Sequence, residues 1–431
     1  MITKRADLSV IISHRSIITP VYPLRKEQSY DKIIQFEFSD RWKAVSEIDK
    51  VKFYIKDFFH RADIFLLFMC TLCAIFGLFM VRNAVVGMAV GGWDMSAPAK
   101  YIAVQAGSIV IGLFAFVVFT VIDADLLGQQ WKLLWAVIIA LLVALVIFGQ
   151  DDGTGNKAWI RFAGIGIQPS EFIKIIYIII SAKHMTYLKE YHDINSFMSV
   201  VQMVGHFMMV FGPIIVISSD LGSCLIIAFV FLMMFFAAGV KMYWFGVGGA
   251  AVAAAVPLLW TYFLKDYQKQ RLIAPYDPSI DPTGYGITWQ TTQSKLTLAS
   301  GRLTGVEEGH TATVFTGKHT DFIFSCVGEN LGMIGCIVVL TLLTIIMVHC
   351  VKIGLQSGRT FDMLLCIGIA AAMAFQTFIN VGMCIGITPV IGITLPFFSY
   401  GGSSMVTMYA AMGIISGVKY KPKPERFSLI Y

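Results

Sequence analysis

The feature that most constrains this chain is a series of apolar runs, each about as long as a helix that crosses a bilayer, roughly 20 residues. They lie near residues 62–82, 101–122, 131–149, 169–187, 197–218, 221–239, 242–263, 322–349, 361–386 and 397–418. Because the bilayer core offers no water to unpaired backbone groups, runs of this length are expected to be helical. The sequence therefore predicts an all-α polytopic membrane protein, with about ten transmembrane helices and one large extracytoplasmic loop.

The composition of the chain is unlike that of a soluble domain. Hydrophobic residues make up 57% of it and charged residues 14%, against about 45–50% and about 25% in soluble domains. The net charge of +6 is modest, and we expect it to reflect membrane topology and not a nucleic-acid partner. Cys70 and Cys73 share one apolar run, which favours packing by small thiols over a metal or redox site.

Residues 1–61 differ from the rest, because charged residues alternate there with short apolar patches. No apolar core follows a basic start and ends in a cleavage site, so we expect no signal peptide. The segment is predicted to be a cytoplasmic extension, either with an amphipathic helix over about 44–59 on the membrane surface or as a solvated tail. Residues 62–420 form the predicted membrane domain, and 421–431 a cytoplasmic tail.

The distribution of Lys and Arg predicts which side each loop faces. One side carries these near its span ends: Lys50, Lys52, Lys56, Arg61, Lys132, Lys183, Lys189, Lys241, Lys352, Arg359, Lys419, Lys421, Lys423 and Arg426. The short loops of the other side carry Arg82, Lys100, Lys157 and Arg161. Cations concentrate in cytoplasmic loops, so both termini are expected in the cytoplasm. By parity, the loops at 150–168, 264–321 and 387–396 face outward.

The first outward loop brings charged residues to the start of a span. It contains Lys157, Trp159 and Arg161, and it leads to Pro169, which suits the first turn of a helix. The pair Glu171 and Lys174 follows on one face of that helix, where each charge is costly unless it is paired. We expect the pair to support a functional site; a capped helix start beside an aromatic belt is the simpler alternative.

The second outward loop, 264–321, is long, has no obvious structure of its own and is broken by glycines. Loops of this kind are usually functional. It ends at Asp321, where the chain re-enters the membrane, and a carboxylate in falling dielectric is costly unless it is used or paired. Cations such as Arg271 suit a phosphate or pyrophosphate ligand. A solvated lid is the alternative reading.

The third outward loop leads into a break at membrane depth, where residues 394–404 combine a proline, glycines and hydroxyl side chains. Irregular backbone at this depth is tolerated where it is buried in protein or lines a wet cavity. We therefore expect this break to belong to the site.

Several stretches resemble, in the same order, the signature blocks of one family. They are Gly155-Asn-Lys-Ala-Trp-Ile160, Gln168-Pro-Ser-Glu171, the region of Gln293 and Ser294, His319-Thr-Asp-Phe-Ile-Phe324 with Gly328-Glu-Asn-Leu-Gly332, and Thr394-Leu-Pro-Phe-Phe-Ser-Tyr-Gly-Gly-Ser-Ser404. The chain thus resembles, over about 62–420, the SEDS family (shape, elongation, division and sporulation), the RodA/FtsW/SpoVE group of bacterial cell-wall synthesis. Residues 266–271, followed by two Asp-Pro turns, are more similar to the elongation-type RodA.

The sequence departs from the family pattern in four places. A family Gln-Pro-Asp-Leu-Gly-Thr reads Ser218-Ser-Asp-Leu-Gly-Ser223 here, a Gly-Gly stretch reads Gly301-Arg-Leu-Thr-Gly305, and Phe315-Thr-Gly-Lys318 replaces a Leu-Pro-Glu. The long amino-terminal extension is also unusual. These departures bear on the subfamily and on the partner more than on the site itself.

The resemblance implies a peptidoglycan glycosyltransferase that polymerises lipid II at the outer face of the bacterial cytoplasmic membrane, within the membrane lipids. A class B penicillin-binding protein is implied as its partner. The family's essential acidic residue maps on Asp321, and its functionally important Trp and Glu map on Trp159 and Glu171. Supporting positions are expected at Lys157, Arg161, Lys174, Arg271, Gln293, His319, Glu329, Ser399 and Ser403.

The chemistry of polymerisation suits these residue types. A sugar hydroxyl must attack an anomeric carbon while a polyprenyl pyrophosphate leaves, so a base must take a proton and cations must receive negative charge. Asp321 is the expected base, and Lys157, Arg161 and Arg271 are expected to hold pyrophosphate. No carboxylate cluster forms a dedicated metal cage, so the expected cofactor is none, or Mg²⁺ or Mn²⁺ bridging the phosphates.

Two other functions use the same ingredients. A flippase or transporter of a lipid-linked precursor would also have many spans and charges at depth, but here the charged motifs gather toward the outer side. A scaffold for penicillin-binding proteins would not depend on Asp321 or Glu171. Polymer formation from lipid II alone would distinguish the polymerase from the other two.

Overall fold

The computed structural model describes residues 58–59, 62–90, 98–150, 157–162, 165–307 and 314–419. The chain divides into two units, residues 1–57 and 58–431, and all that follows concerns the second. The predicted extension, its amphipathic helix and the carboxy-terminal tail lie almost wholly outside the described residues.

Each of the ten predicted spans coincides with one helix. These are α4 (Ile64–Val90), α5 (Pro98–Val121), α7 (Trp131–Phe148), α8 (Pro169–Tyr191), α9 (Phe197–Ser218), α10 (Leu221–Ala238), α11 (Met242–Leu258), α14 (Ile323–Ser357), α15 (Thr360–Ile385) and α16 (Gly402–Val418). Within the described residues, eight helices are long and apolar enough to cross a membrane. The other two are α8, which carries several charges, and α16, with 17 residues. The prediction of an all-α polytopic fold is confirmed.

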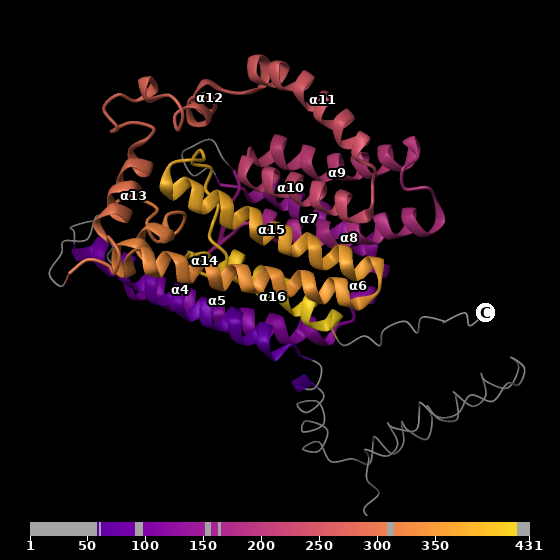
Figure 1. Ribbon diagram of the computed structural model, residues 1–431, viewed down its shortest axis with the longest axis horizontal. Helices are drawn as coiled ribbons and strands as arrows, with labels where there is room; N and C mark the ends of the chain where they lie inside the picture. The colour runs from indigo at the N-terminus through magenta and orange to yellow at the C-terminus, as the bar shows by residue number, and fades with distance from the viewer. Residues whose placement is uncertain are drawn as a thin grey trace, which may run out of the picture. The chain divides into compact units, whose positions relative to one another are not determined.

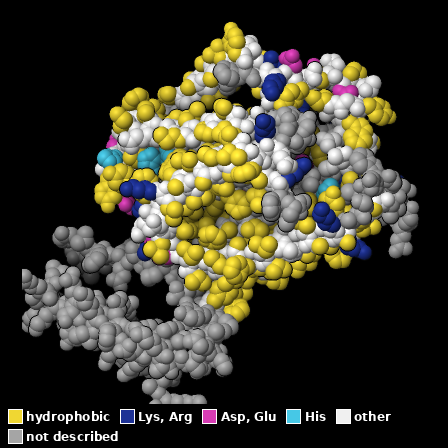
Figure 2. All heavy atoms as spheres, turned by 180° about the vertical axis from the view of Figure 1, so that it is seen from behind, with side chains coloured by type: hydrophobic (Ala, Val, Ile, Leu, Met, Phe, Trp, Pro, Cys, Tyr) yellow, Lys and Arg dark blue, Asp and Glu magenta, His cyan; other side chains and the backbone are white. Residues whose placement is uncertain are grey.

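The long helices lie side by side with roughly parallel axes (Figure 1). The closest packing joins α16 to α5, and α14 and α10 to α15. Helix α15 is the most buried of the candidate spans, whereas α11, which ends in the π-helical turn Leu259–Phe263, buries none of its side chains. Figure 2 shows hydrophobic side chains over the broad middle of one face, with charged side chains toward its two ends. This is the surface expected of a bundle in lipid.

The predicted irregularity of loop 264–321 was wrong, since the loop contains α12 (Asp266–Ile273), a 3-10 turn (Pro278–Ile280) and α13 (Trp289–Ser300). Helix α13 buries Ser294 and Thr297 and packs on α14. The glycine at its end permits this packing, because a Cβ on Gly301 would lie 1.8 Å from the carbonyl oxygen of Gly328. Gly301 therefore both ends α13, as the glycines of this loop predicted, and allows close contact with α14.

The two ends of the bundle differ. At the end that carries α13, a two-stranded antiparallel ribbon of β1 (Ile160–Phe162) and β2 (Ile165–Ile167) leads into α8. The short helix α6 (Ala124–Gln129) follows α5. At the opposite end of the bundle, buried Asp63 pairs with His349 Nε2 at 2.8 Å and with Lys419 Nζ at 3.0 Å. This cluster joins the ends of α4, α14 and α16 away from the predicted site.

Candidate active site

A cavity of about 440 Å³ opens at the α13 end of the bundle. Its lining comes from the starts of α5, α8, α10 and α16, from the strand segment at 159–166, and from the segments before α14 and after α15. Side chains or backbone of these residues line it: Tyr101, Val104, Trp159, Arg161, Gly166, Gln168, Glu171, Asp220, Ser223, Ile226, Thr320, Asp321, 391–394 and 400–402. All three loops that were predicted to face one side thus meet at one cavity.

Asp321 lies in the turn just before α14, with its side chain partly exposed to this cavity. Within the described part of the chain, its carboxylate makes no ion pair and accepts no hydrogen bond. Burial raises the pKa of this carboxyl to about 6, because the ionised form loses water without gaining a cation. A carboxylate that titrates near neutral pH suits a general base.

His319 lies two residues before Asp321 and packs between two tyrosines that line the cavity. Its ring packs at 5.3 Å from Tyr101 and 5.6 Å from Tyr400, and burial lowers its pKa to about 4. The imidazole is therefore neutral at neutral pH. The carbonyl of His319 accepts the backbone N–H of Tyr400 at 2.9 Å, which ties the turn to the break before α16.

Asn380, in the last turns of α15, holds the turn that carries Asp321. Its amide nitrogen donates to the carbonyl oxygen of Asp321 at 2.8 Å and to that of Ile393 at 2.7 Å. One buried side chain thus fixes the Asp321 backbone and the loop after α15, which form two walls of the cavity. Sequence reasoning missed Asn380; a buried amide inside an otherwise apolar span was the available signal.

Glu171 and Lys174 form the predicted ion pair, with Oε2 and Nζ 3.0 Å apart and side chains 6% and 2% exposed. Thr407 of α16 donates to the same carboxylate at 3.5 Å. Glu171 also lines the cavity that contains Asp321. The pair is buried at the wall of the site, so losing either charge would leave the other without compensation in low dielectric.

Asp220 is a third carboxylate at this cavity. It caps the start of α10 by accepting the N–H of Ser223, and its other oxygen accepts from Gln168 at 3.0 Å, from Ser170 at 3.2 Å and from the Ser223 hydroxyl at 2.7 Å. These neutral donors link the start of α8 to the start of α10. The acid of the Ser218–Ser223 motif pointed to this residue, which the site prediction had not included.

The strand segment supplies the aromatic and cationic wall. Trp159 and Arg161 both line the cavity, and Trp159 packs on Gly166, where a Cβ would lie 3.1 Å from the indole. Lys157 precedes them and is exposed; its backbone N–H donates to the carbonyl of Ser218 at 3.1 Å. The structure thus brings Trp159 and Arg161 to Asp321 and leaves the Lys157 side chain outside the cavity lining.

Arg271, which was predicted to hold pyrophosphate, does not line the cavity that contains Asp321. Helix α12 positions it over a second cavity of about 300 Å³, together with Asp281, Thr288, Lys295 and Gly386. The loop after α15 contributes Val390 to this cavity and Ile391 to the first. The physical reason is the helical structure of loop 264–321, which holds Arg271 away from the Asp321 turn.

The remaining predicted residues surround the site and do not line its cavity. Glu329 forms a buried ion pair with Lys318, and Ser399 Oγ accepts the N–H of Leu395 at 2.8 Å. Ser403 accepts the N–H of Gln168 at 3.1 Å. Gln293 lies on α13, one residue before Ser294, which donates to the carbonyl of Cys384 at 2.8 Å. These contacts hold the segments around the cavity in place.

The described residues contain no group of three or more His, Cys, Asp or Glu side chains that could hold a metal ion. Of the three cavity carboxylates, Glu171 is paired with Lys174 and Asp220 accepts three donors through one oxygen. Asp321 is the acid that is left for a ligand.

The family model described as cell cycle protein, for FtsW, RodA and SpoVE, matches residues 63–423. The chain is 30% identical over 351 residues to the peptidoglycan glycosyltransferase MrdB of Escherichia coli K12, covering 79% of this chain and 90% of that protein. It is 32% identical over 373 residues to the probable peptidoglycan glycosyltransferase FtsW of Geobacter metallireducens, covering 84% and 96%.

Solved structures agree on the fold. A chain of a peptidoglycan synthase complex, described for its coordination of polymerisation and crosslinking, matches with a TM-score of 0.69 at 24% identity, covering 84% of this chain and 99% of that chain. The rod shape determining protein RodA of Thermus thermophilus matches with a TM-score of 0.58 at 22% identity, covering 84% and 98%. With residues of four signature blocks lining one cavity and the family model matching residues 63–423, the chain belongs to the FtsW/RodA/SpoVE family of cell cycle proteins, the SEDS family.

Proposed function

We propose that this protein is a peptidoglycan glycosyltransferase that polymerises lipid II at the outer face of the bacterial cytoplasmic membrane, in cell elongation, division or sporulation. The observation that carries the proposal is the unpaired carboxylate of Asp321 facing a cavity that Arg161 also lines. Relatives named as peptidoglycan glycosyltransferases over most of this chain support the same activity.

The reaction joins two lipid-linked sugars. The hydroxyl of the acceptor attacks the anomeric carbon of the donor, the new glycosidic bond forms, and the bond to the pyrophosphate breaks. Asp321 takes the hydroxyl proton as the oxygen attacks. Its raised pKa makes it basic enough to accept a proton while it stays ionised at neutral pH.

Negative charge develops on the departing pyrophosphate, and a cation must receive it. Arg161 is the cation at the cavity, and its planar guanidinium can donate to two phosphate oxygens. The Lys174 ammonium is already paired with Glu171, so it supports the cavity wall and is not assigned to the pyrophosphate. Trp159 offers an apolar face against which a sugar ring can pack.

A divalent cation, Mg²⁺ or Mn²⁺, would supply further charge neutralisation of the pyrophosphate if one binds there, since hard cations prefer oxygen ligands. The described carboxylates leave Asp321 alone to contribute a protein ligand, so the substrate would supply most of the coordination. Loss of polymer in a chelator, with recovery on adding Mg²⁺, would support this requirement.

A class B penicillin-binding protein is the proposed partner. The matched peptidoglycan synthase complex combines polymerisation with crosslinking, and a polymerase of glycan strands needs a crosslinking enzyme to build a wall. Both termini are proposed to lie in the cytoplasm, on the basis of the Lys and Arg distribution.

The proposal is tested by incubating the purified protein with lipid II, alone and with its penicillin-binding partner, and reading polymer on a gel. We expect glycan strands in at least the partner-supplied reaction. Movement of lipid II across vesicles without polymer would indicate a transporter instead. A protein that only recruits the partner would give no polymer and no lipid movement.

A further inference from the structure

A third cavity, the α8–α9 cavity, lies far from Asp321, near the opposite ends of α7, α8 and α9. It has a volume of about 600 Å³, within the range of small-molecule sites. On α8, Glu171 lines the cavity that contains Asp321, and His184 lines the α8–α9 cavity. Thirteen residues of helix separate the two side chains by about 20 Å. The two cavities are therefore distinct sites.

The pocket is lined mainly by apolar side chains, with a few polar side chains among them. Trp135, Ile180 and Met209 supply apolar surface, while Lys183 and His184 add a cation and an imidazole. Trp131 and Tyr187 are about half exposed at its rim, as is usual for aromatic residues at the level of lipid headgroups. Among the described lining residues there is no carboxylate. The pocket thus favours a ligand with an apolar body and an anionic group.

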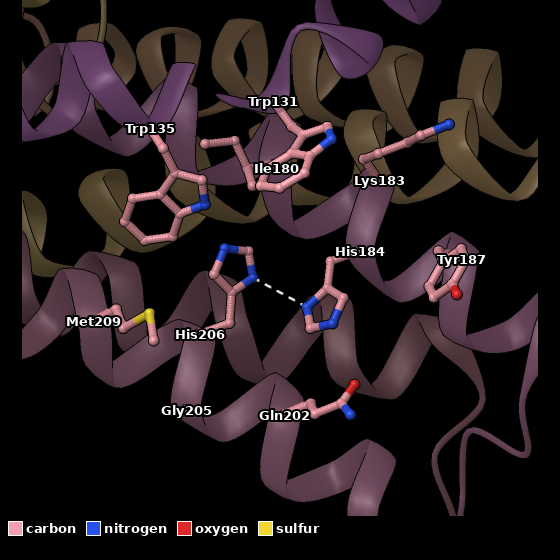
Figure 3. A pocket seen from close by; sticks show the side chains of 10 residues that line it. All are labelled: Trp131, Trp135, Ile180, Lys183, His184, Tyr187, Gln202, Gly205, His206 and Met209. Carbon is pink, nitrogen blue, oxygen red and sulfur yellow. Dashed lines mark hydrogen bonds between the residues drawn. The ribbon is translucent and has the colours of Figure 1, made fainter. Parts of the chain in front are cut away.

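Figure 3 shows His184 of α8 and His206 of α9 pointing toward one another across the pocket. Their Nδ1 atoms are 3.1 Å apart, so one ring donates and the other accepts, and His206 also packs at 5.2 Å from Trp135. Lys183 extends from α8 away from both Trp131 and the two imidazoles. The polar groups therefore divide into a paired interior and a cationic rim.

From this arrangement we infer that the pocket binds an anionic diacyl phospholipid, on the side proposed above as cytoplasmic. The acyl chains lie against Trp135, Ile180 and Met209, and the phosphate meets the Lys183 ammonium at the rim. Basic pockets between transmembrane helices on the cytoplasmic side are suited to such headgroups. An uncharged lipid would fill the apolar part of the pocket equally well, but it would make no ion pair with Lys183.

Gly205 is a position at which an added side chain would enter the pocket. It lines the cavity, and a Cβ added there would meet no atom within 4 Å. A leucine at this position therefore fills the space of the ligand without clashing. Gly107 on α5 is equally open and lies outside the pocket, so Gly107→Leu is a matched control for adding a side chain to a helix surface.

The experiment measures binding of phosphatidylglycerol and of phosphatidylcholine with identical chains to the purified full-length protein, by native mass spectrometry. We expect preferential binding of phosphatidylglycerol, about fivefold weaker in Lys183→Ala, as for one cation near a membrane surface. Lys189→Ala removes a charge from the same helix outside the pocket and should change nothing. Gly205→Leu should reduce binding of the lipid, and Gly107→Leu should not.

Equal binding of the two lipids would overturn the inference, as would an equal loss in Lys189→Ala, which would reduce the effect to net charge. Preference for a polyprenyl phosphate over phosphatidylglycerol, or displacement of the lipid by millimolar inorganic phosphate, would also overturn it, because each names another source of the phosphate. None of these measurements involves lipid II or polymerisation, so they fail or succeed independently of the proposed activity.

Discussion

Asp321 is a carboxylate whose surroundings leave it charged but uncompensated. His319, two residues away in the same turn, is kept neutral by burial, which lowers its pKa to about 4, and the Lys174 ammonium is paired with Glu171. Had Lys174 or a charged His319 paired with Asp321, the pKa of the carboxyl would fall and its basicity with it. The Glu171–Lys174 pair and the neutral His319 therefore keep the Asp321 carboxylate basic.

The pH dependence of polymerisation follows from this pKa. Asp321 is ionised above about pH 6 and protonated below it, so kcat/KM should be constant above about pH 7 and fall about tenfold per unit well below 6. Rates of polymer formation at fixed lipid II, across the pH range, measure this. A wild-type rate that stays flat to pH 5 would exclude Asp321 as the base.

Replacing Glu171 by Gln should reduce both stability and activity. The change leaves the Lys174 ammonium buried without its partner, and breaking a buried pair costs about 3–5 kcal/mol. Thermal unfolding in detergent and polymerisation rates are the readouts. In the double variant Glu171→Gln/Lys174→Met, stability should return while activity stays low if the carboxylate also contacts substrate. Wild-type values for both in the single variant would contradict the burial of the pair.

At the scale of elements, α15 positions the site through one side chain. Asn380→Ala removes two hydrogen bonds and leaves the carbonyls of Asp321 and Ile393 without that donor, at a cost of about 1–3 kcal/mol for each unsatisfied group. We expect a lower melting temperature and a larger loss in kcat than in KM, since the turn that carries the base is freed.

Thr377→Val is the matched control on the same helix. The Thr377 hydroxyl donates to the carbonyl of Met373 within α15, so its loss should leave the turn in place and the rate close to wild type. Equal rate losses in the two variants would mean that α15 supports the fold in general and not the Asp321 turn in particular.

The elements that hydropathy governs could be predicted from the sequence, and those that packing governs could not. Ten apolar runs gave ten helices because a bilayer leaves backbone few alternatives. Helices α12 and α13 were missed because both are short and polar, and the packing of α13 on α14 is a tertiary contact. The same applies to the site: Asp321 and the Glu171–Lys174 pair were evident as costly charges, while the Asn380 contacts and the distance of Arg271 from the cavity depend on tertiary structure.

At the scale of the whole molecule, the loops of the site share one end of the bundle and the Asp63 cluster lies at the other. This polarity makes the proposed orientation testable with single cysteines, because seven of the eight native cysteines are buried and Cys336 is only partly exposed. Exposed Thr304 lies at the site end and exposed Lys241 between α10 and α11.

In intact cells, a membrane-impermeant thiol reagent should label Thr304→Cys and spare Lys241→Cys. Labelling of both after the cells are opened shows that each cysteine is reactive. Labelling of the Lys241→Cys variant alone in intact cells would reverse the orientation and place the reaction on the cytoplasmic side.

The central claim is that Asp321 is the base of a polymerase, and Asp321→Asn tests it most directly. Asn keeps the size of the side chain and cannot accept the proton. Stability should survive: the raised pKa means that this group stabilises the folded state fully below its ordinary value of 3.8 and loses that contribution as the pH rises through about 6. At pH 7.5 the neutral amide should therefore keep or raise the melting temperature.

The activity is measured with lipid II and the penicillin-binding partner. We expect polymer from the wild type and at least about a hundredfold less from Asp321→Asn, the range of rate enhancement that general-base catalysis supplies. The variant should still bind the partner and lipid II. Full polymerisation by a folded Asp321→Asn protein would contradict the account.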